Sequence, residues 1–473
     1  MRFLRYTHEW APATIVGMCS RLHLRVIALV AALALTPALL PAQSQGANKP
    51  PLGWNSWDSY GLSVTEAEWK SNVAWFHEHL QPAGWQHVVL DEGWYLAHPE
   101  NAESQGGKGD QGYTLDANGE FVPATNRFPE GLVGLAKYAH GLGLKFGIHI
   151  IRGIPKQAVA GNMPIAGSKG ADGTPLHAAD AAETTDLCRW NPDNYGVRNN
   201  AAGQAYYDGL MKLYAGWGVD FLKVDCISKP YKADEIHMIH SAIAKTGRPM
   251  VLSLSPGATP LEQAADLQQN AQMWRISDDV WDVWSNSKPA DSFPQTVERQ
   301  FDVLASWMQW QQPGRWPDAD MLPIGMLGPR PGWGKPRESR LTADETQSML
   351  TLWAIAKSPL ILGSNLLQMS SSLTAMLTNP EWLAVDQGGL RPQLVLSESG
   401  TVVWRSNSAE GDAYIAVFNV ADEPSNINLS WKQAGLAIGH HRVRDLWLRQ
   451  DLGSFGGLQI QLPAHGSKLY RVR

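Results

Sequence analysis

The sequence has few cysteines, no basic tract and, beyond its first 42 residues, no apolar run long enough to cross a bilayer. Only three cysteines occur among 473 residues, and none has the spacing of a zinc or iron–sulfur site, so we expect no metal and no cofactor. The net charge is −6, and the absence of clustered lysine and arginine argues against a nucleic-acid partner.

The first 42 residues have the pattern of a secretory leader. Basic residues precede an apolar run over residues 26–35, and small residues follow near Ala42. The run is too short for a membrane span. We therefore predict a signal peptide over residues 1–42 and export to the periplasm or the extracellular space, with either Met1 or Met18 as the start.

Two cysteines remain once the leader is removed, Cys188 and Cys226. In an exported protein such a pair indicates one disulfide bond. Two buried free thiols are the alternative interpretation.

Tryptophan is abundant, with 21 residues in an otherwise ordinary globular composition of 44% hydrophobic and 18% charged residues. Indole rings fill cores, and they also stack on the C–H faces of sugars. We favour carbohydrate contact for some of them. The length suits one large domain with a smaller second one.

Short apolar runs of strand length alternate with helical patterns through most of the chain. The candidate strands cover residues 51–55, 86–92, 144–149, 218–225, 249–255, 272–277, 316–320 and 359–363. The helical patterns cover residues 65–79, 131–140, 202–214 and 342–356. Eight continuous apolar strands alternating with helices predict an α/β fold, a (β/α)8 barrel over residues 48–386.

Two insertions interrupt this alternation of strands and helices, and towards the C-terminus the helical patterns end. Residues 95–130 and 152–190 follow strand ends and are rich in small and polar residues, so we expect them to form lids or binding loops over the catalytic face. Residues 390–473 show short strand patterns without helical periodicity, at residues 402–405, 413–420, 427–431 and 467–471. They predict an antiparallel β-sandwich domain joined through residues 386–389. This domain could stabilise the barrel or bind carbohydrate.

Acidic residues stand at two strand ends. Lys223 and Asp225 are two positions apart, so both face the same side of one strand, and Asp279 follows another strand. In a barrel these ends meet at one mouth. Two carboxylates there are what glycoside hydrolysis needs, although Asp225 could instead cap the next helix or simply pair with Lys223.

Several motifs, in order, resemble glycoside hydrolase family 27, which contains α-galactosidases and α-N-acetylgalactosaminidases. They lie at residues 51–57, 221–225, 274–279, 316–322 and 352–360. The resemblance implies that Asp225 is the nucleophile and that Asp279, rather than Asp278, is the acid/base of a retaining exo-glycosidase. It also implies sugar contacts: Arg275 with the 2-hydroxyl, Lys223 with the 3- and 4-hydroxyls, Trp57 on the sugar ring, Asp91 with O4, and Asp320 on the anomeric side.

The chain departs from this family pattern at three places. Glu92 stands where the family has aspartate beside Asp91, residues 253–257 match neither usual substrate class, and His149 replaces a common tyrosine, as a sugar contact or as a core residue. The family disulfide implies a Cys188–Cys226 bond, although Cys226 is one residue earlier than usual.

The substrate that the resemblance implies is a terminal α-D-galactoside. The extra methylene of Glu92 could crowd the 6-hydroxymethyl group of galactose, and L-arabinopyranose lacks that group. A β-L-arabinopyranosidase with the same catalytic pair is therefore the alternative, unless Glu92 retracts in another rotamer. The oligomeric state is left open.

Overall fold

The computed structural model describes residues 47–102, 108–289, 292–328 and 335–473. The predicted leader over residues 1–42 lies outside the described residues, so export stays a prediction. Within the described ranges, no helix is long and apolar enough to cross a membrane. The same ranges contain no group of histidine, cysteine and acidic side chains that could hold a metal ion.

Eight parallel strands of the described chain form one sheet, ordered β10-β9-β8-β7-β3-β2-β1-β13. A parallel bridge between Leu322 and Leu362 links its two edges. All eight predicted strands are present, and the barrel prediction is confirmed. The bounds are β1 (Leu52–Asn55), β2 (His87–Leu90), β3 (Lys145–Ile151), β7 (Phe221–Asp225), β8 (Val251–Leu254), β9 (Met273–Arg275), β10 (Trp316–Asp318) and β13 (Leu360–Leu362).

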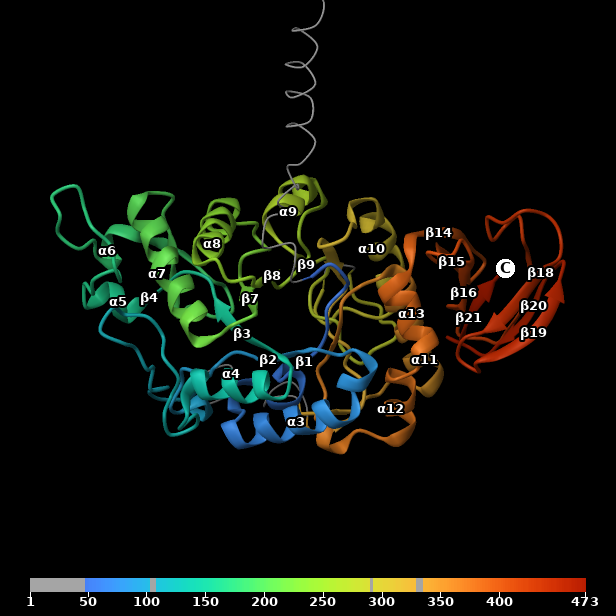
Figure 1. Cartoon of the computed structure of the whole chain (residues 1–473), viewed down its shortest axis with the longest axis horizontal. Coiled ribbons are helices and arrows are strands. Elements are labelled where there is room, and N and C mark those ends of the chain that lie inside the picture. Colours follow the sequence, from blue (N-terminus) through green and yellow to red (C-terminus); the bar gives the residue numbers. More distant parts are fainter. Residues whose placement is uncertain (1–46, 103–107, 290–291, 329–334) are drawn as a thin grey trace, which may run out of the picture. The chain divides into compact units, whose positions relative to one another are not determined.

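Helices follow the strands and surround them (Figure 1). The predicted helices are confirmed, and the first begins at a capping box in which Thr65 and Glu68 each accept the other's backbone N–H. The main helices are α3 (Glu66–His79), α4 (Gly131–Gly141), α7 (Ala201–Trp217), α8 (Ala233–Thr246), α9 (Ala264–Asn270), α10 (Gln300–Trp307), α11 (Ala343–Ala356), α12 (Ser371–Leu377) and α13 (Pro380–Gly388). Short turns of helix are α2 (Trp57–Tyr60), α5 (Lys156–Ala160) and α6 (Ala178–Ala181).

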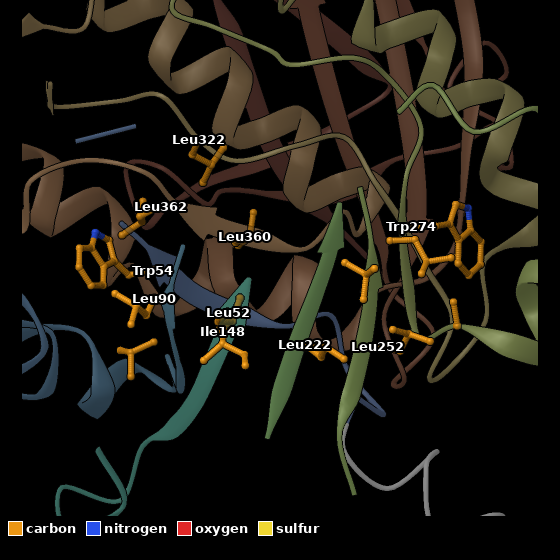
Figure 2. Close-up of a cluster of buried hydrophobic side chains, with 14 of the residues drawn as sticks. Leu52, Trp54, Leu90, Ile148, Leu222, Leu252, Trp274, Leu322, Leu360 and Leu362 are labelled. Atoms are coloured by element: carbon orange, nitrogen blue, oxygen red, sulfur yellow. The ribbon is translucent and has the colours of Figure 1, made fainter. Parts of the chain in front are cut away.

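Alternation along each strand separates two layers of side chains. Leu222 and its equivalents on neighbouring strands belong to the core between strands and helices (Figure 2). Phe221 belongs instead to a separate cluster with Val89 and Val251. Because side chains alternate with a period of two, Lys223 and Asp225 share the side of Phe221 and lie toward the C-terminal end of β7.

The insertion over residues 152–190 is more ordered than loops alone. Together with the residues that follow, it contributes a three-stranded antiparallel sheet of β4 (Ile154–Pro155), β6 (Asn194–Val197) and β5 (Ala182–Leu187). These strands were not predicted. The polar, largely exposed residues of β5 hide the alternation of a buried strand, and β4 and β6 are only two and four residues long.

The predicted joint at residues 386–389 lies where the last barrel helix ends and the first strand of the C-terminal domain begins, and it is helical rather than an open turn. Residues 386–388 form the last turn of α13, and Gly389 caps it. Asn379 begins this helix by accepting the backbone N–H of Glu381 at 2.9 Å, with Pro380 in the first turn. The glycines therefore end a helix rather than form a linker.

The C-terminal residues form the predicted antiparallel β sandwich. A six-stranded sheet, ordered β14-β15-β16-β21-β18-β19, packs its apolar face against the pair β17–β20. The sequence predicted β15, β16, β17 and β21 but not the other four. The bounds are β14 (Leu390–Glu398), β15 (Thr401–Asn407), β16 (Ala413–Asn419), β17 (Ser425–Ser430), β18 (His441–Asp445), β19 (Gln450–Phe455), β20 (Gly457–Leu462) and β21 (Ser467–Val472).

Replacing Leu222 by alanine tests the packing of the core between the strands and the helices. Its side chain is fully buried, so the cavity should lower the free energy of unfolding by about 2–5 kcal/mol. The matched control is Leu367→Ala, because Leu367 is 50% exposed and its loss should cost at most about 0.5 kcal/mol. Urea unfolding of both variants measures the difference, and equal destabilisation would contradict this packing.

Candidate active site

The carboxylate of Asp225 is held at the end of β7 by two neighbours. One oxygen accepts the backbone N–H of Cys226 at 2.7 Å, and the other lies 3.2 Å from Nε2 of His149. His149 is fully buried in β3. Burial would lower the pKa of His149, but the Asp91 carboxylate and the contact with Asp225 raise it above its usual value. His149 therefore contacts the predicted nucleophile rather than only filling the core.

The backbone just beyond Asp225 is fixed in an unusual conformation. Cys226 has a φ of 62°, and it forms a disulfide with Cys188 at a Cα–Cα distance of 5.9 Å, as predicted. Arg152 donates from Nε to the Cys226 carbonyl at 2.8 Å and from its backbone N–H to the Asp225 carbonyl at 3.1 Å. Arg152 is itself buried between Glu235 and Asp186. These bonds determine where the Asp225 carboxylate lies.

Lys223 and Asp91 form a buried ion pair beside Asp225. The ammonium lies 2.8 Å from the carboxylate of Asp91, which also accepts an N–H of Asn55 at 2.6 Å. Burial would raise the pKa of Asp91, but Lys223 and His149 hold it well below its usual range. Burial would lower the pKa of Lys223, but Asp91 and Asp225 raise it. Both groups are therefore charged at neutral pH.

Glu92 is tied to the loop that carries the disulfide. Its Oε1 accepts an N–H of Asn191 at 2.6 Å, and its backbone N–H donates to Asp91 at 2.8 Å. Its carboxylate is close enough to help raise the pKa of buried Tyr95. The longer side chain thus reaches the loop around Cys188 and fixes it beside Asp91.

Asp279 belongs to a second cluster, built around Arg275 at the end of β9. The guanidinium lies 3.2 Å from Asp279 and 2.7 Å from Asp320. Asp320, at a φ of 90°, also accepts the backbone N–H of Val280 at 2.7 Å and that of Met321 at 2.7 Å. Asp320 therefore holds the backbone directly after Asp279 as well as Arg275.

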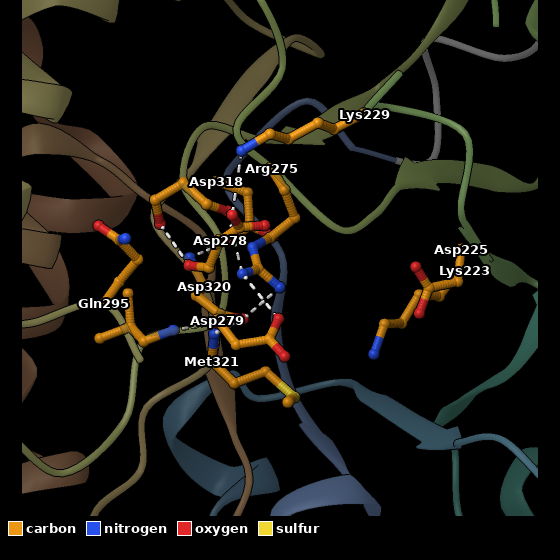
Figure 3. Close-up of polar contacts among 12 residues, drawn as sticks. Lys223, Asp225, Lys229, Arg275, Asp278, Asp279, Gln295, Asp318, Asp320 and Met321 are labelled. Atoms are coloured by element: carbon orange, nitrogen blue, oxygen red, sulfur yellow. Dashed lines mark hydrogen bonds and ion pairs between the residues drawn. The ribbon is translucent and has the colours of Figure 1, made fainter. Parts of the chain in front are cut away.

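Figure 3 shows these two clusters, with Lys223 and Asp225 on one side and Asp279, Arg275 and Asp320 on the other. Asp58, in α2 just after β1, interacts electrostatically with both: with Lys223 and Asp91, and with Asp279. The predicted carboxylates are therefore brought to the same end of the barrel.

Asp58 is a further acid that the sequence analysis missed. It is buried over Gly363 at the end of β13, where a Cβ would lie 2.0 Å from its carboxylate. Burial raises the pKa of Asp58 to about 7; Lys223 opposes this, and Asp279 adds to it. Asp58 could have been found from its position shortly after the first strand.

Trp57 begins α2 and is partly buried against the core. Its backbone N–H donates to Asn55 at 2.8 Å, and Asn55 binds Asp91, so the first strand positions both. Asn55 could have been found as a strand-end polar residue. Arg152 and Asn191 could not, because their partners are distant in the sequence.

The loop at residues 253–257 closely approaches the loop of the predicted acid. A Cβ added to Gly257 would lie 2.0 Å from the carbonyl oxygen of Ser277, so only glycine fits there. Ser253 lies in β8 beside Lys223, within a cavity that also contacts Arg275. A larger residue at position 257 would displace the backbone that leads to Asp279.

Comparison with known proteins identifies the family. The family model described as alpha galactosidase A matches residues 195–388, and that of the alpha galactosidase C-terminal beta sandwich domain matches residues 398–472. A solved GH27 β-L-arabinopyranosidase from Geobacillus stearothermophilus is 42% identical, with a TM-score of 0.83 over 91% of this chain and 97% of that chain. This protein belongs to glycoside hydrolase family 27. It is a glycosidase, and its substrates are carbohydrates.

More distant relatives in the curated set are α-galactosidases. Alpha-galactosidase A of Cellvibrio japonicus is 26% identical over 94% of this chain and 98% of that protein. The α-galactosidase of Oryza sativa is 27% identical over 89% of this chain and 84% of that protein. The relatives of this chain thus include enzymes with two different substrate preferences.

The raised pKa of Asp58 makes a stability prediction. Its folded pKa of about 7 lies above that of an unfolded aspartate, so ionisation opposes folding and stability is lost as the pH rises toward 7. Asp58→Asn removes this penalty. The melting temperature of the variant relative to the unmodified protein should therefore increase from about pH 5 to about pH 8.

Asp451→Asn is the control, since that side chain is 82% exposed. The raised pKa of Asp58 would be contradicted if the difference in melting temperature between Asp58→Asn and the unmodified protein stayed constant or decreased with rising pH.

Proposed function

We propose that this protein is a retaining β-L-arabinopyranosidase that uses Asp225 as nucleophile and Asp279 as acid/base. The observation that carries the substrate assignment is the contact of Glu92 with Asn191, 2.6 Å long, beside Asp91. It is supported by the 42% identity to the Geobacillus stearothermophilus β-L-arabinopyranosidase, a variant of which was solved in complex with arabinose.

The electrostatics suit a nucleophile at Asp225. The charge of Lys223 acts on Asp225, and Nε2 of His149 lies 3.2 Å from one oxygen of its carboxylate. In the first step the Asp225 carboxylate attacks the anomeric carbon as the bond to the leaving oxygen breaks. A glycosyl-enzyme of opposite anomeric configuration results.

Asp279 suits the acid/base role because of what surrounds it. Its side chain is 34% exposed, and Arg275 contacts it from the barrel side. It donates a proton to the leaving oxygen, and then removes a proton from the water that attacks the glycosyl-enzyme. The second inversion restores the original configuration, so the released sugar keeps the anomeric configuration of the substrate.

The substrate preference follows from the space around C5 of the sugar. By the resemblance described above, Asp91 would hold O4 of galactose, and the acid beside it would lie next to the 6-hydroxymethyl group. Here the second acid is one methylene longer, and it accepts a hydrogen bond from Asn191, in the loop that also contains Cys188 of the disulfide. The longer acid and this loop leave less room beside C5. A pyranose without a 6-hydroxymethyl group fits this smaller space best.

A terminal α-D-galactoside is the second candidate. The matching family models and the curated relatives are of α-galactosidases, which favours it. Since Glu92 is already engaged with Asn191, galactose would bind if this contact leaves the 6-hydroxymethyl group enough room. The two candidates differ in glycone only, and both use the same catalytic pair.

The variant Glu92→Asp distinguishes the two candidate substrates. We expect the ratio of kcat/KM for 4-nitrophenyl β-L-arabinopyranoside over 4-nitrophenyl α-D-galactopyranoside to exceed one in the unmodified protein. The variant should lower this ratio by about 10–200-fold, the usual effect of one methylene in a pocket. Asn191→Ala, which frees the loop, should shift the ratio in the same direction.

The matched control is Glu398→Asp, the same change at an exposed position of β14, which should leave the ratio unchanged. A preference for the galactoside in the unmodified protein would reject the arabinopyranosidase assignment and favour the second candidate.

A further inference from the structure

An ion pair beside the predicted acid joins the two catalytic loops. Lys229 lies in the loop after β7, and Asp278 directly precedes Asp279 in the loop after β9. The ammonium of Lys229 lies 3.1 Å from the carboxylate of Asp278. Figure 3 shows Lys229 extending toward Asp278, on the side of the site that contains Arg275 and Asp279.

This ion pair contributes little to folding. The side chains of Lys229 and Asp278 are 44% and 27% exposed, and ion pairs of such exposure add little stability. Burial raises the pKa of Asp278 above its usual value, and Lys229 opposes this rise. The pair thus presents a half-exposed acceptor and a half-exposed donor beside the catalytic acid.

The stereochemistry of the reaction places the leaving group next to this pair. Asp225 attacks one face of the anomeric carbon, so the leaving oxygen departs from the opposite face and takes its proton from Asp279. Asp278 interacts electrostatically with Asp279 and with Arg275, so its carboxylate lies beside the group that protonates the leaving oxygen. A sugar unit attached through that oxygen therefore comes within reach of both charged groups.

We propose that Lys229 and Asp278 form a binding site for a sugar leaving group, in which Asp278 accepts hydrogen bonds from its hydroxyls and Lys229 donates to them. The proposal rests on the assignment of Asp279 as the acid, and it does not depend on which glycone is cleaved. It predicts a preference for glycosidic substrates whose leaving group is itself hydroxylated.

Three substrates with the same glycone separate this role from catalysis. A 4-nitrophenyl glycoside has a good leaving group without hydroxyls, a methyl glycoside has a poor one without hydroxyls, and a disaccharide has a poor one with hydroxyls. Only the last two depend strongly on the acid, and only the last can use the proposed site.

In Lys229→Met and in Asp278→Asn, the ratio of kcat/KM for the disaccharide to that for the methyl glycoside should fall about 10-fold, the effect of one charge-assisted hydrogen bond. The matched control is the pair Lys245–Asp208 on α8 and α7, with side chains 51% and 34% exposed. Lys245→Met and Asp208→Asn should leave the ratio unchanged.

Two results would overturn the proposal. One is a ratio that does not change in either variant. The other is an equal loss on the methyl glycoside and the disaccharide, which would show that the pair acts through Asp279 and not on the leaving group. Failure of the proposed function is recognised separately, because the unmodified protein would then prefer the 4-nitrophenyl α-D-galactopyranoside, and the series is repeated with α-D-galactopyranosides.

Discussion

The site depends on charge compensation at the buried end of the barrel. Lys223 is paired with Asp91 and acts on Asp225, and Arg275 is paired with Asp320 and Asp279. An unpaired charge at such depth would be strongly destabilising, so removing either cation would leave uncompensated carboxylates. The two cations thus allow several acids to lie together, and the proposed catalytic pair is part of the same arrangement.

Backbone geometry supports this arrangement on the side of Asp225. The backbone N–H of Cys226 donates to Asp225, and the disulfide and Arg152 hold Cys226 in its left-handed conformation. On the other side Asp320 holds the backbone after Asp279. Both carboxylates are therefore positioned by neighbours that take no direct part in the proposed chemistry.

Much of this architecture could be predicted from the sequence. Eight buried strands read as apolar runs, and the period of two along β7 already placed Lys223 and Asp225 on one side. The predicted sugar contacts at Asp91 and Arg275 lie where the strand ends suggested, although their roles stay predictions. These successes rest on local patterns, in which each residue's neighbours in sequence are also its neighbours in space.

The parts that were missed depend on contacts between distant segments. Asn191 meets Glu92 across 99 positions, and Arg152 meets Cys226 across 74, so neither contact has a local signature. The strand β19 was missed because all its residues are exposed. The helix α13 was not predicted because two glycines end it, and glycine marks turns as well as helix ends.

The most direct test of the account is to trap the glycosyl-enzyme. The protein is incubated with a fluorinated pyranosyl fluoride of the preferred glycone, which slows hydrolysis of the intermediate, and is then digested and analysed by mass spectrometry. We predict one added sugar on the peptide that contains Asp225, and none in Asp225→Asn. A sugar attached to another residue, or release of product with inverted configuration, would contradict the central claim.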